Sequence, residues 1–180
     1  MRLTRRKLLG MGAITAAGGL FGLTACSGPA PAATAVPART FEVMRTDAQW
    51  QQQLTPAQYQ VLRRQSTERP YSSPLNKEHR KGTFTCAGCA LPLFSSSTKF
   101  DSGTGWPSFW APLHNAVAED RDTTFGMLRV EAHCRRCGGH LGHVFDDGPR
   151  PTGLRYCMNG VAMNFVAGTE EMRVRIPNRT

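Results

Sequence analysis

Cys157 is the residue of this sequence best suited to act as a nucleophile. It lies in the run Leu154–Asn159, LRYCMN, which predicts a short β-strand. The reactive form of a cysteine is its thiolate, and a nearby cation lowers the pKa of the thiol. Because side chains alternate along a strand, Arg155 and Asn159 would share the face of Cys157. The run predicts a reactive thiol, although a lone cysteine is also typical of a buried core.

Two histidines and two aspartates precede this strand and add groups that can transfer protons. His140 and His143 lie three residues apart, and Asp146 and Asp147 follow them. An imidazole gains and loses a proton near neutral pH, and a neighbouring carboxylate can orient it or hold it protonated. Each histidine alone also fits a surface or packed side chain. Their closeness in sequence to Cys157 favours a catalytic site.

Four of the six cysteines form two Cys-x-x-Cys pairs, Cys86 with Cys89 and Cys134 with Cys137. Two residues between cysteines let both thiolates face one ion, and two such pairs complete a closed tetrahedral zinc site. We therefore predict one structural Zn²⁺ per chain, held by these four thiolates. Two local disulfides, or redox motifs of the thioredoxin type, are the alternative, which the lack of a surrounding βαβ pattern disfavours.

The rest of the pattern predicts a mainly β domain over residues 46–168, built of antiparallel strands after one or two short helices. Thr55 as N-cap followed by Pro56 predicts a helix start, and that helix is expected to end near Gln65. Short runs divided by Gly, Pro and Asp clusters predict the strands, among them residues 82–85, 127–132 and 154–159.

Residues 1–25 are typical of an export signal. Arg5 and Arg6 precede an apolar run of 18 residues that contains five glycines, which is a poor permanent anchor. The residues around the arginine pair resemble a twin-arginine signal, and those before Cys26 resemble a bacterial lipobox. We expect lipidation of Cys26, with a plain cleaved signal or a short transmembrane anchor as alternatives. Residues 26–45, rich in Pro and Ala, predict a flexible tether to the membrane.

The charge of the chain disfavours nucleic acid as a partner. The net charge is +9, and it falls to +5 without residues 1–25, which hold four basic and no acidic side chains. Such a balance is ordinary for a soluble domain. We expect a monomer located in the cell envelope, and residues 169–180 form a basic tail without a predicted role.

Three segments, in this order, carry a resemblance to a known family: TPAQYQVLRRQSTERPYS, CAGCALPLFSSSTKFDSGTGWPSFW and HCRRCGGHLGHVFDDGPRPTGLRYCMN. Over residues 49–166 the sequence resembles methionine-R-sulfoxide reductase of the B type. The resemblance implies two antiparallel sheets that close over each other, with zinc held by the two cysteine pairs.

The resemblance also implies roles for individual residues. Cys157 would attack the sulfur of methionine-R-sulfoxide and become a sulfenic acid. His143, with His140, would supply protons, and Arg155 would favour the thiolate. The implied supporting groups are Asp147 and Asn159, and the implied apolar wall against the substrate methyl is Trp106. The implied partners are oxidised proteins as substrates, in a repair role, and a thiol or thioredoxin-like protein as reductant.

Two departures from the family pattern bear on this chemistry. Many members carry a recycling cysteine where this chain has Thr104, so the Cys157 sulfenic acid would be reduced directly by an external thiol, selenol or partner protein. Members commonly continue Asn-Ser-Ala-Ser-Leu-Arg-Phe, whereas residues 159–165 here read NGVAMNF. We expect activity, but not necessarily the typical kinetics.

Two other functional classes are alternatives. A non-catalytic, zinc-stapled interaction module would leave Cys157 unreactive towards a thiol probe. A general thiol–disulfide oxidoreductase would need a second redox cysteine, and four zinc thiolates leave none free.

Overall fold

The computed structural model describes residues 39–126 and 128–168. The predicted export signal, Cys26, most of the predicted tether, Met127 and the tail 169–180 lie outside these residues. The helices are α1 (Asp47–Gln53) and α2 (Pro56–Arg64), and the 3₁₀ turns are η1 (Pro74–Lys77), η2 (Ser96–Thr98), η3 (Thr124–Gly126) and η4 (Gly160–Ala162). The strands are β1 (Gly82–Cys86), β2 (Pro92–Ser95), β3 (Lys99–Phe100), β4 (Ser108–Phe109), β5 (Val117–Asp122), β6 (Arg129–Cys134), β7 (His140–Phe145), β8 (Arg155–Met158) and β9 (Met163–Ala167).

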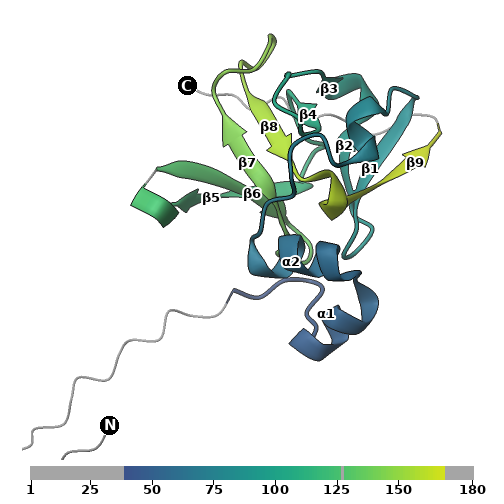
Figure 1. The fold of residues 1–180 in the computed structure, drawn as a ribbon, viewed down its shortest axis with the longest axis vertical. Coiled ribbons are helices and arrows are strands. Elements are labelled where there is room, and N and C mark those ends of the chain that lie inside the picture. The colour runs from purple at the N-terminus through teal and green to yellow at the C-terminus, as the bar shows by residue number, and fades with distance from the viewer. Residues whose placement is uncertain (1–38, 127, 169–180) are drawn as a thin grey trace, which may run out of the picture. The chain divides into compact units, whose positions relative to one another are not determined.

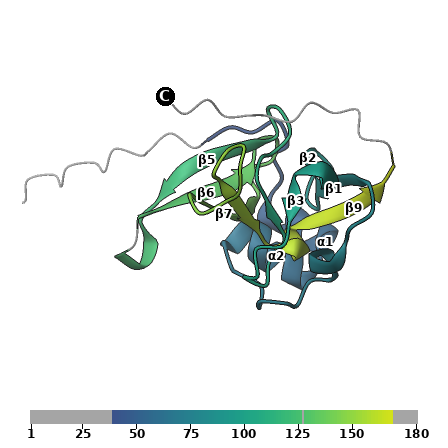
Figure 2. The same ribbon diagram turned by 90° about the horizontal axis from the view of Figure 1, so that it is seen from above.

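The strands form two antiparallel sheets, which confirms the predicted fold class. The smaller sheet has the order β2-β1-β9, and the larger has the order β3-β4-β8-β7-β6-β5. In both views β5 and β6 lie on the opposite side of the domain from β1, β2 and β9 (Figures 1 and 2). Strand β8 is therefore an interior strand of the larger sheet, flanked by β4 and β7.

Helix α2 begins after Thr55, where the sequence predicts a helix start, and α1 begins in the same way after Thr46. Thr46 and Thr55 each form a capping box with the glutamine three residues later, and α2 ends at Gln65 in the left-handed conformation. The side chains that these helices bury are Trp50, Tyr59, Val61 and Leu62. Helix α2 packs on β7 and η4 (Figure 1), so its position supports both. Neither helix has the length and apolar character needed to cross a bilayer, and the same holds for every described helix.

An aromatic cluster joins the two sheets. Phe84 and Phe94 come from the smaller sheet, and Phe109 and Tyr156 come from the larger one; all four are fully buried. The Phe94 and Phe109 rings stack with centroids 4.3 Å apart, and Phe84 meets Phe109 edge to face at 4.9 Å. Because Tyr156 points into this core, its neighbour Cys157 points to the opposite face of β8.

Residues 39–45 pack on the domain, although the sequence predicts them to be the end of a flexible tether. The backbone N–H of Val43 donates to the carbonyl oxygen of Arg136 at 3.0 Å, and Glu42 forms an ion pair with Arg135 at 2.5 Å. Arg39 forms a further ion pair with Asp120. The prediction of a flexible tether is therefore wrong for residues 39–45. These residues contact distant parts of the chain, and composition alone does not reveal such contacts.

Candidate functional site

The four predicted metal ligands meet at one place. Cys86 ends β1 and Cys134 ends β6, and each is followed by its partner in a tight turn. The four Sγ atoms lie within 4.8 Å of one another, and all five described cysteines are free thiols. The alternative of two local disulfides is therefore not supported.

The spacing of the sulfurs fits a tetrahedral ion. Bonds of about 2.3 Å to a tetrahedral zinc place its sulfur ligands about 3.8 Å apart. The Cys86 and Cys137 sulfurs lie 3.7 Å apart, and the Cys89 and Cys134 sulfurs lie 3.5 Å apart. Since β1 belongs to one sheet and β6 to the other, an ion here would tie the two sheets together.

The backbone turns that present these cysteines are alike. The N–H of Ala90 donates to the carbonyl oxygen of Cys86, and the N–H of Gly138 donates to that of Cys134, both at 2.8 Å. Ala90 and Gly138 have positive φ angles of 57° and 67°. Glycine suits this conformation, and a Cβ at Gly138 would also overlap the ring of Phe41.

Cys157 lines a small pocket, on the face of β8 opposite the aromatic cluster. Its pairing partners are Ser108 on β4 and His143 on β7. The pocket has a volume of about 190 Å³. Its lining consists of Thr67, Trp106, Arg129, Gly142, His143, Phe145, Cys157 and Asn159. The structure thus brings together the predicted nucleophile, one predicted histidine, the predicted tryptophan and the predicted asparagine.

The environment of Cys157 keeps its thiol protonated in the free protein. Burial raises the pKa of Cys157, and a hydrogen bond with Thr104 and the nearby Arg155 cation oppose this shift without cancelling it. The Thr104 hydroxyl oxygen lies 3.9 Å from the sulfur. Arg155 favours the thiolate, as the sequence predicts, but burial has the larger effect on the pKa.

Asp147 serves Arg155 and not a histidine, so the prediction that it orients an imidazole is wrong. Arg155 donates from Nε and Nη2 to the two carboxylate oxygens of Asp147, at 2.8 Å each. This pair lowers the pKa of Asp147, and the guanidinium also lies over the ring of Phe145 at 4.3 Å. Asp147 therefore positions the cation that faces Cys157.

The carboxylates that hold the two histidines come from other strands. His143 Nε2 lies 2.8 Å from Asp122 on β5, and His140 Nδ1 lies 2.7 Å from Glu131 on β6. The sequence analysis missed both acids, because they precede the histidines by many residues. The one sequence signal for them is that charged residues alternate along the predicted strands. The register between these strands, which pairs the acids with the histidines, is not visible in the sequence.

His143 is poised as a neutral imidazole. Burial lowers the pKa of His143, and the Asp122 carboxylate only partly opposes this effect. Asp122 itself stays ionised, because hydrogen bonds from Thr124 and then from His143 hold its pKa well below the usual range. His143 therefore donates its Nε2 proton to Asp122, which leaves Nδ1 free to accept a proton.

Glu68, which the sequence analysis also missed, connects the remaining walls of the pocket. Its carbonyl oxygen accepts a hydrogen bond from Trp106 Nε1 at 3.1 Å, and its N–H donates to Asn159 Oδ1 at 3.0 Å. Asn159 in turn donates from Nδ2 to the carbonyl oxygen of Leu141 at 3.0 Å. The amide of Asn159 therefore fixes the pocket wall, and Glu68 holds the Trp106 ring in place.

Comparison with known proteins identifies the family to which the chain belongs. The SelR domain matches residues 54–167. The peptide methionine sulfoxide reductase MsrB of Agrobacterium fabrum is 56% identical over 125 residues, which cover 69% of this chain and 93% of that protein. The MsrB of Thiobacillus denitrificans is 57% identical over 122 residues, covering 67% and 92%, and that of Leptospira interrogans is 51% identical over 126 residues, covering 69% and 96%. The chain therefore belongs to the SelR-domain family of MsrB-type peptide methionine sulfoxide reductases.

Proposed function

We propose that this protein reduces methionine-R-sulfoxide in oxidised proteins to methionine and so repairs oxidative damage. The observation that carries the proposal is that Cys157, Trp106 and His143 line the same pocket. An indole face suits the methyl group of the substrate, and a histidine suits the sulfoxide oxygen. Membership of the MsrB family supports the same reaction.

In the proposed reaction the sulfur of Cys157 attacks the sulfur of the sulfoxide. His143 accepts the thiol proton at Nδ1 and returns it to the sulfoxide oxygen, and Asp122 keeps the imidazole oriented throughout. The sulfur–oxygen bond of the substrate then breaks and the oxygen, with its proton, bonds to the Cys157 sulfur, while the bond between the two sulfurs breaks and releases methionine. The products are methionine and a Cys157 sulfenic acid, so the cysteine is oxidised by two electrons as the substrate is reduced.

Regeneration then requires an external reductant. Thr104 occupies the position of the recycling cysteine, and the four other cysteines of the described ranges, 39–126 and 128–168, belong to the metal cluster. A first external thiol displaces water from the sulfenic acid and forms a mixed disulfide. A second thiol, from the same reductant or a thioredoxin-like partner, releases Cys157 and leaves with the disulfide.

The metal of the cysteine cluster is, in this proposal, a structural Zn²⁺. Cys86, Cys89, Cys134 and Cys137 would supply four thiolates, which complete a tetrahedral shell and leave no position for substrate or water. None of these cysteines lines the Cys157 pocket. Zinc bound here would hold the two sheets together and take no part in the reaction.

The reaction is tested by its stereochemistry and by its first intermediate. We expect turnover of dabsyl-methionine-R-sulfoxide with dithiothreitol and at least about a hundredfold slower turnover of the S epimer, because one pocket orients the methyl group and the oxygen. After a single turnover without reductant, a sulfenic-acid probe should label Cys157, as read by mass spectrometry. Equal rates for the epimers, or a Cys157 disulfide within the chain, would contradict the proposal.

We also propose that the protein is exported and anchored through lipidated Cys26, on the strength of the sequence of residues 1–26. Two or three acyl chains bind a bilayer stably, since each buried CH₂ contributes about 0.8 kcal/mol. Mass spectrometry of the N-terminal peptide should find acylated Cys26 at its start, and Cys26→Ser should move the protein out of the membrane fraction. An unmodified Cys26 in the native host would refute the anchor.

A further inference from the structure

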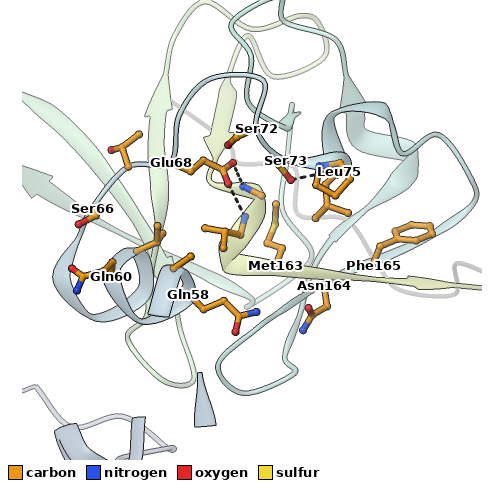
Figure 3. A pocket seen from close by; sticks show the side chains of 16 residues that line it. Gln58, Gln60, Ser66, Glu68, Ser72, Ser73, Leu75, Met163, Asn164 and Phe165 are labelled. Atoms are coloured by element: carbon orange, nitrogen blue, oxygen red, sulfur yellow. Dashed lines mark hydrogen bonds between the residues drawn. The ribbon is translucent and has the colours of Figure 1, made fainter. Parts of the chain in front are cut away.

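A second, larger cavity opens beside the Cys157 pocket. Its volume is about 580 Å³, and it lies between α2, the loop of residues 66–75 and the η4–β9 segment (Figure 3). Apolar side chains make up much of its lining, chiefly Val61, Leu75, Val161, Met163 and Phe165. We call this cavity the side groove. It has the size of ligand pockets in general, about 300–1,000 Å³.

The Cys157 pocket alone is too small to hold more of a substrate than one side chain. Its volume is about 190 Å³, whereas a protein substrate carries a chain on both sides of its methionine sulfoxide. An extended chain advances about 3.3 Å per residue, so the neighbours of the oxidised residue must lie over the adjacent surface. The chemical character of that adjacent surface then determines which residues next to the methionine sulfoxide bind well.

The side groove shares a wall with the Cys157 pocket. Thr67 lines both, and the chain that leaves β8 after Cys157 forms η4, which is part of the groove. Glu68 reinforces this wall from the groove side, because its carboxylate accepts the N–H groups of Gly160 at 2.5 Å and Val161 at 3.0 Å (Figure 3). The groove is therefore adjacent surface that a chain can reach while its oxidised methionine occupies the Cys157 pocket.

Gly160 makes this wall possible. A Cβ at position 160 would overlap the side chain of Ser73, so only glycine lets the loop of residues 66–75 approach η4 this closely. Gly160 thus shapes the groove. Leu75, which follows in η1, extends its apolar lining.

The chemistry of the groove selects an apolar occupant. Glu68 is the sole ionisable residue among those that line it, its two carboxylate oxygens are already bonded to the backbone, and burial raises its pKa. An acidic side chain would be repelled by that carboxylate, and a charged side chain of either sign would lose hydration against the apolar lining.

We propose that the side groove binds an apolar side chain of the substrate protein next to the methionine sulfoxide. The protein would then prefer oxidised methionines in exposed apolar segments over those in polar segments. The inference rests on the proposed reductase function and names the class of substrate that the reductase favours.

Two pentapeptides with a central methionine-R-sulfoxide test this preference, one flanked by leucines and one by serines. With dithiothreitol as reductant, we expect kcat/KM to be about tenfold higher for the leucine peptide, as burial of part of one leucine side chain would give. N-acetyl-methionine-R-sulfoxide, which has no neighbouring side chain and no large apolar label, reports the basal reaction. Equal kcat/KM for the two peptides in the wild type would overturn the proposal. Failure on N-acetyl-methionine-R-sulfoxide would instead overturn the reductase function itself.

Leu75→Asp places a charge in the groove, and Leu128→Asp controls for an added surface charge. Because Leu75 also packs on the core, thermal unfolding of Leu75→Asp must show that the variant is folded. Leu128 is 72% exposed and does not line the groove. Leu75→Asp should abolish the preference for leucine while turnover of N-acetyl-methionine-R-sulfoxide stays unchanged, and Leu128→Asp should keep the preference. A preference that survives Leu75→Asp would overturn the proposal. So would an effect of Leu75→Asp that appears only with a protein reductant, because the groove would then serve the reductant.

Discussion

Replacing Cys157 with serine is expected to lower turnover of methionine-R-sulfoxide by at least about a thousandfold. A hydroxyl is close in size to a thiol but is a far weaker nucleophile towards sulfur. Strand β8 should survive the change, because the fully buried Tyr156 makes the core contact and Cys157 faces the pocket. Steady-state turnover of the dabsyl substrate with dithiothreitol, wild type against Cys157→Ser, measures the effect.

Thr104→Val is the control for this substitution, because it removes only the hydroxyl beside the sulfur. The hydrogen bond from Thr104 lowers the pKa of Cys157, so its loss should raise that pKa further. Activity should then fall at neutral pH and recover as the pH rises and the thiolate forms, whereas Cys157→Ser should recover at no pH. A serine variant within tenfold of the wild type would show that the chemistry lies at another residue.

Replacing Cys134 with serine is expected to have the largest effect on folding. Cys134 is fully buried at the end of β6, and its sulfur lies 3.5 Å from that of Cys89 in the cysteine cluster. A serine is a poor zinc ligand, so the proposed zinc ion between the sheets would be lost with its binding free energy. We expect the free energy of unfolding to fall by more than about 4 kcal/mol, a large part of the stability of a typical domain.

Zinc content by mass spectrometry and thermal unfolding by circular dichroism measure this loss. Cys157→Ser is the matched control, since it also exchanges a cysteine for serine but outside the cluster, and it should keep one zinc per chain and the wild-type Tm. An unchanged Tm in metal-free Cys134→Ser would contradict a structural role for the ion.

The features that the sequence predicts correctly depend on local signals. The helix at Thr55 follows from its capping residues, and the metal quartet follows from the spacing within each cysteine pair. Arg155 lies on the same face as Cys157 because alternation along one strand requires no knowledge of other strands. These inferences depend on only a few consecutive residues, so they can be made without knowledge of the tertiary structure.

The features that the sequence does not predict depend on contacts between distant segments. Asp122 and Glu131 lie beside the histidines because of the register in which β5, β6 and β7 pair. The sequence alone does not reveal that register. Asp147 lies close to His143 in sequence but bonds to Arg155. Burial likewise raises the pKa of Cys157, and burial depends on how the whole domain packs. The neighbouring Arg155 cation, which the sequence does show, has the opposite and smaller effect.

The place of Cys157 within its sheet also determines how little it can move. Strand β8 is paired with β4 on one side and β7 on the other, and Tyr156 anchors it beside Phe94 with ring centroids 5.9 Å apart. Segments held in this way open, and exchange their amide hydrogens, only at free energies close to that of global unfolding. The reacting sulfur thus belongs to one of the slowest-opening parts of the domain. Substrate and reductant must each adapt their own conformation to reach it.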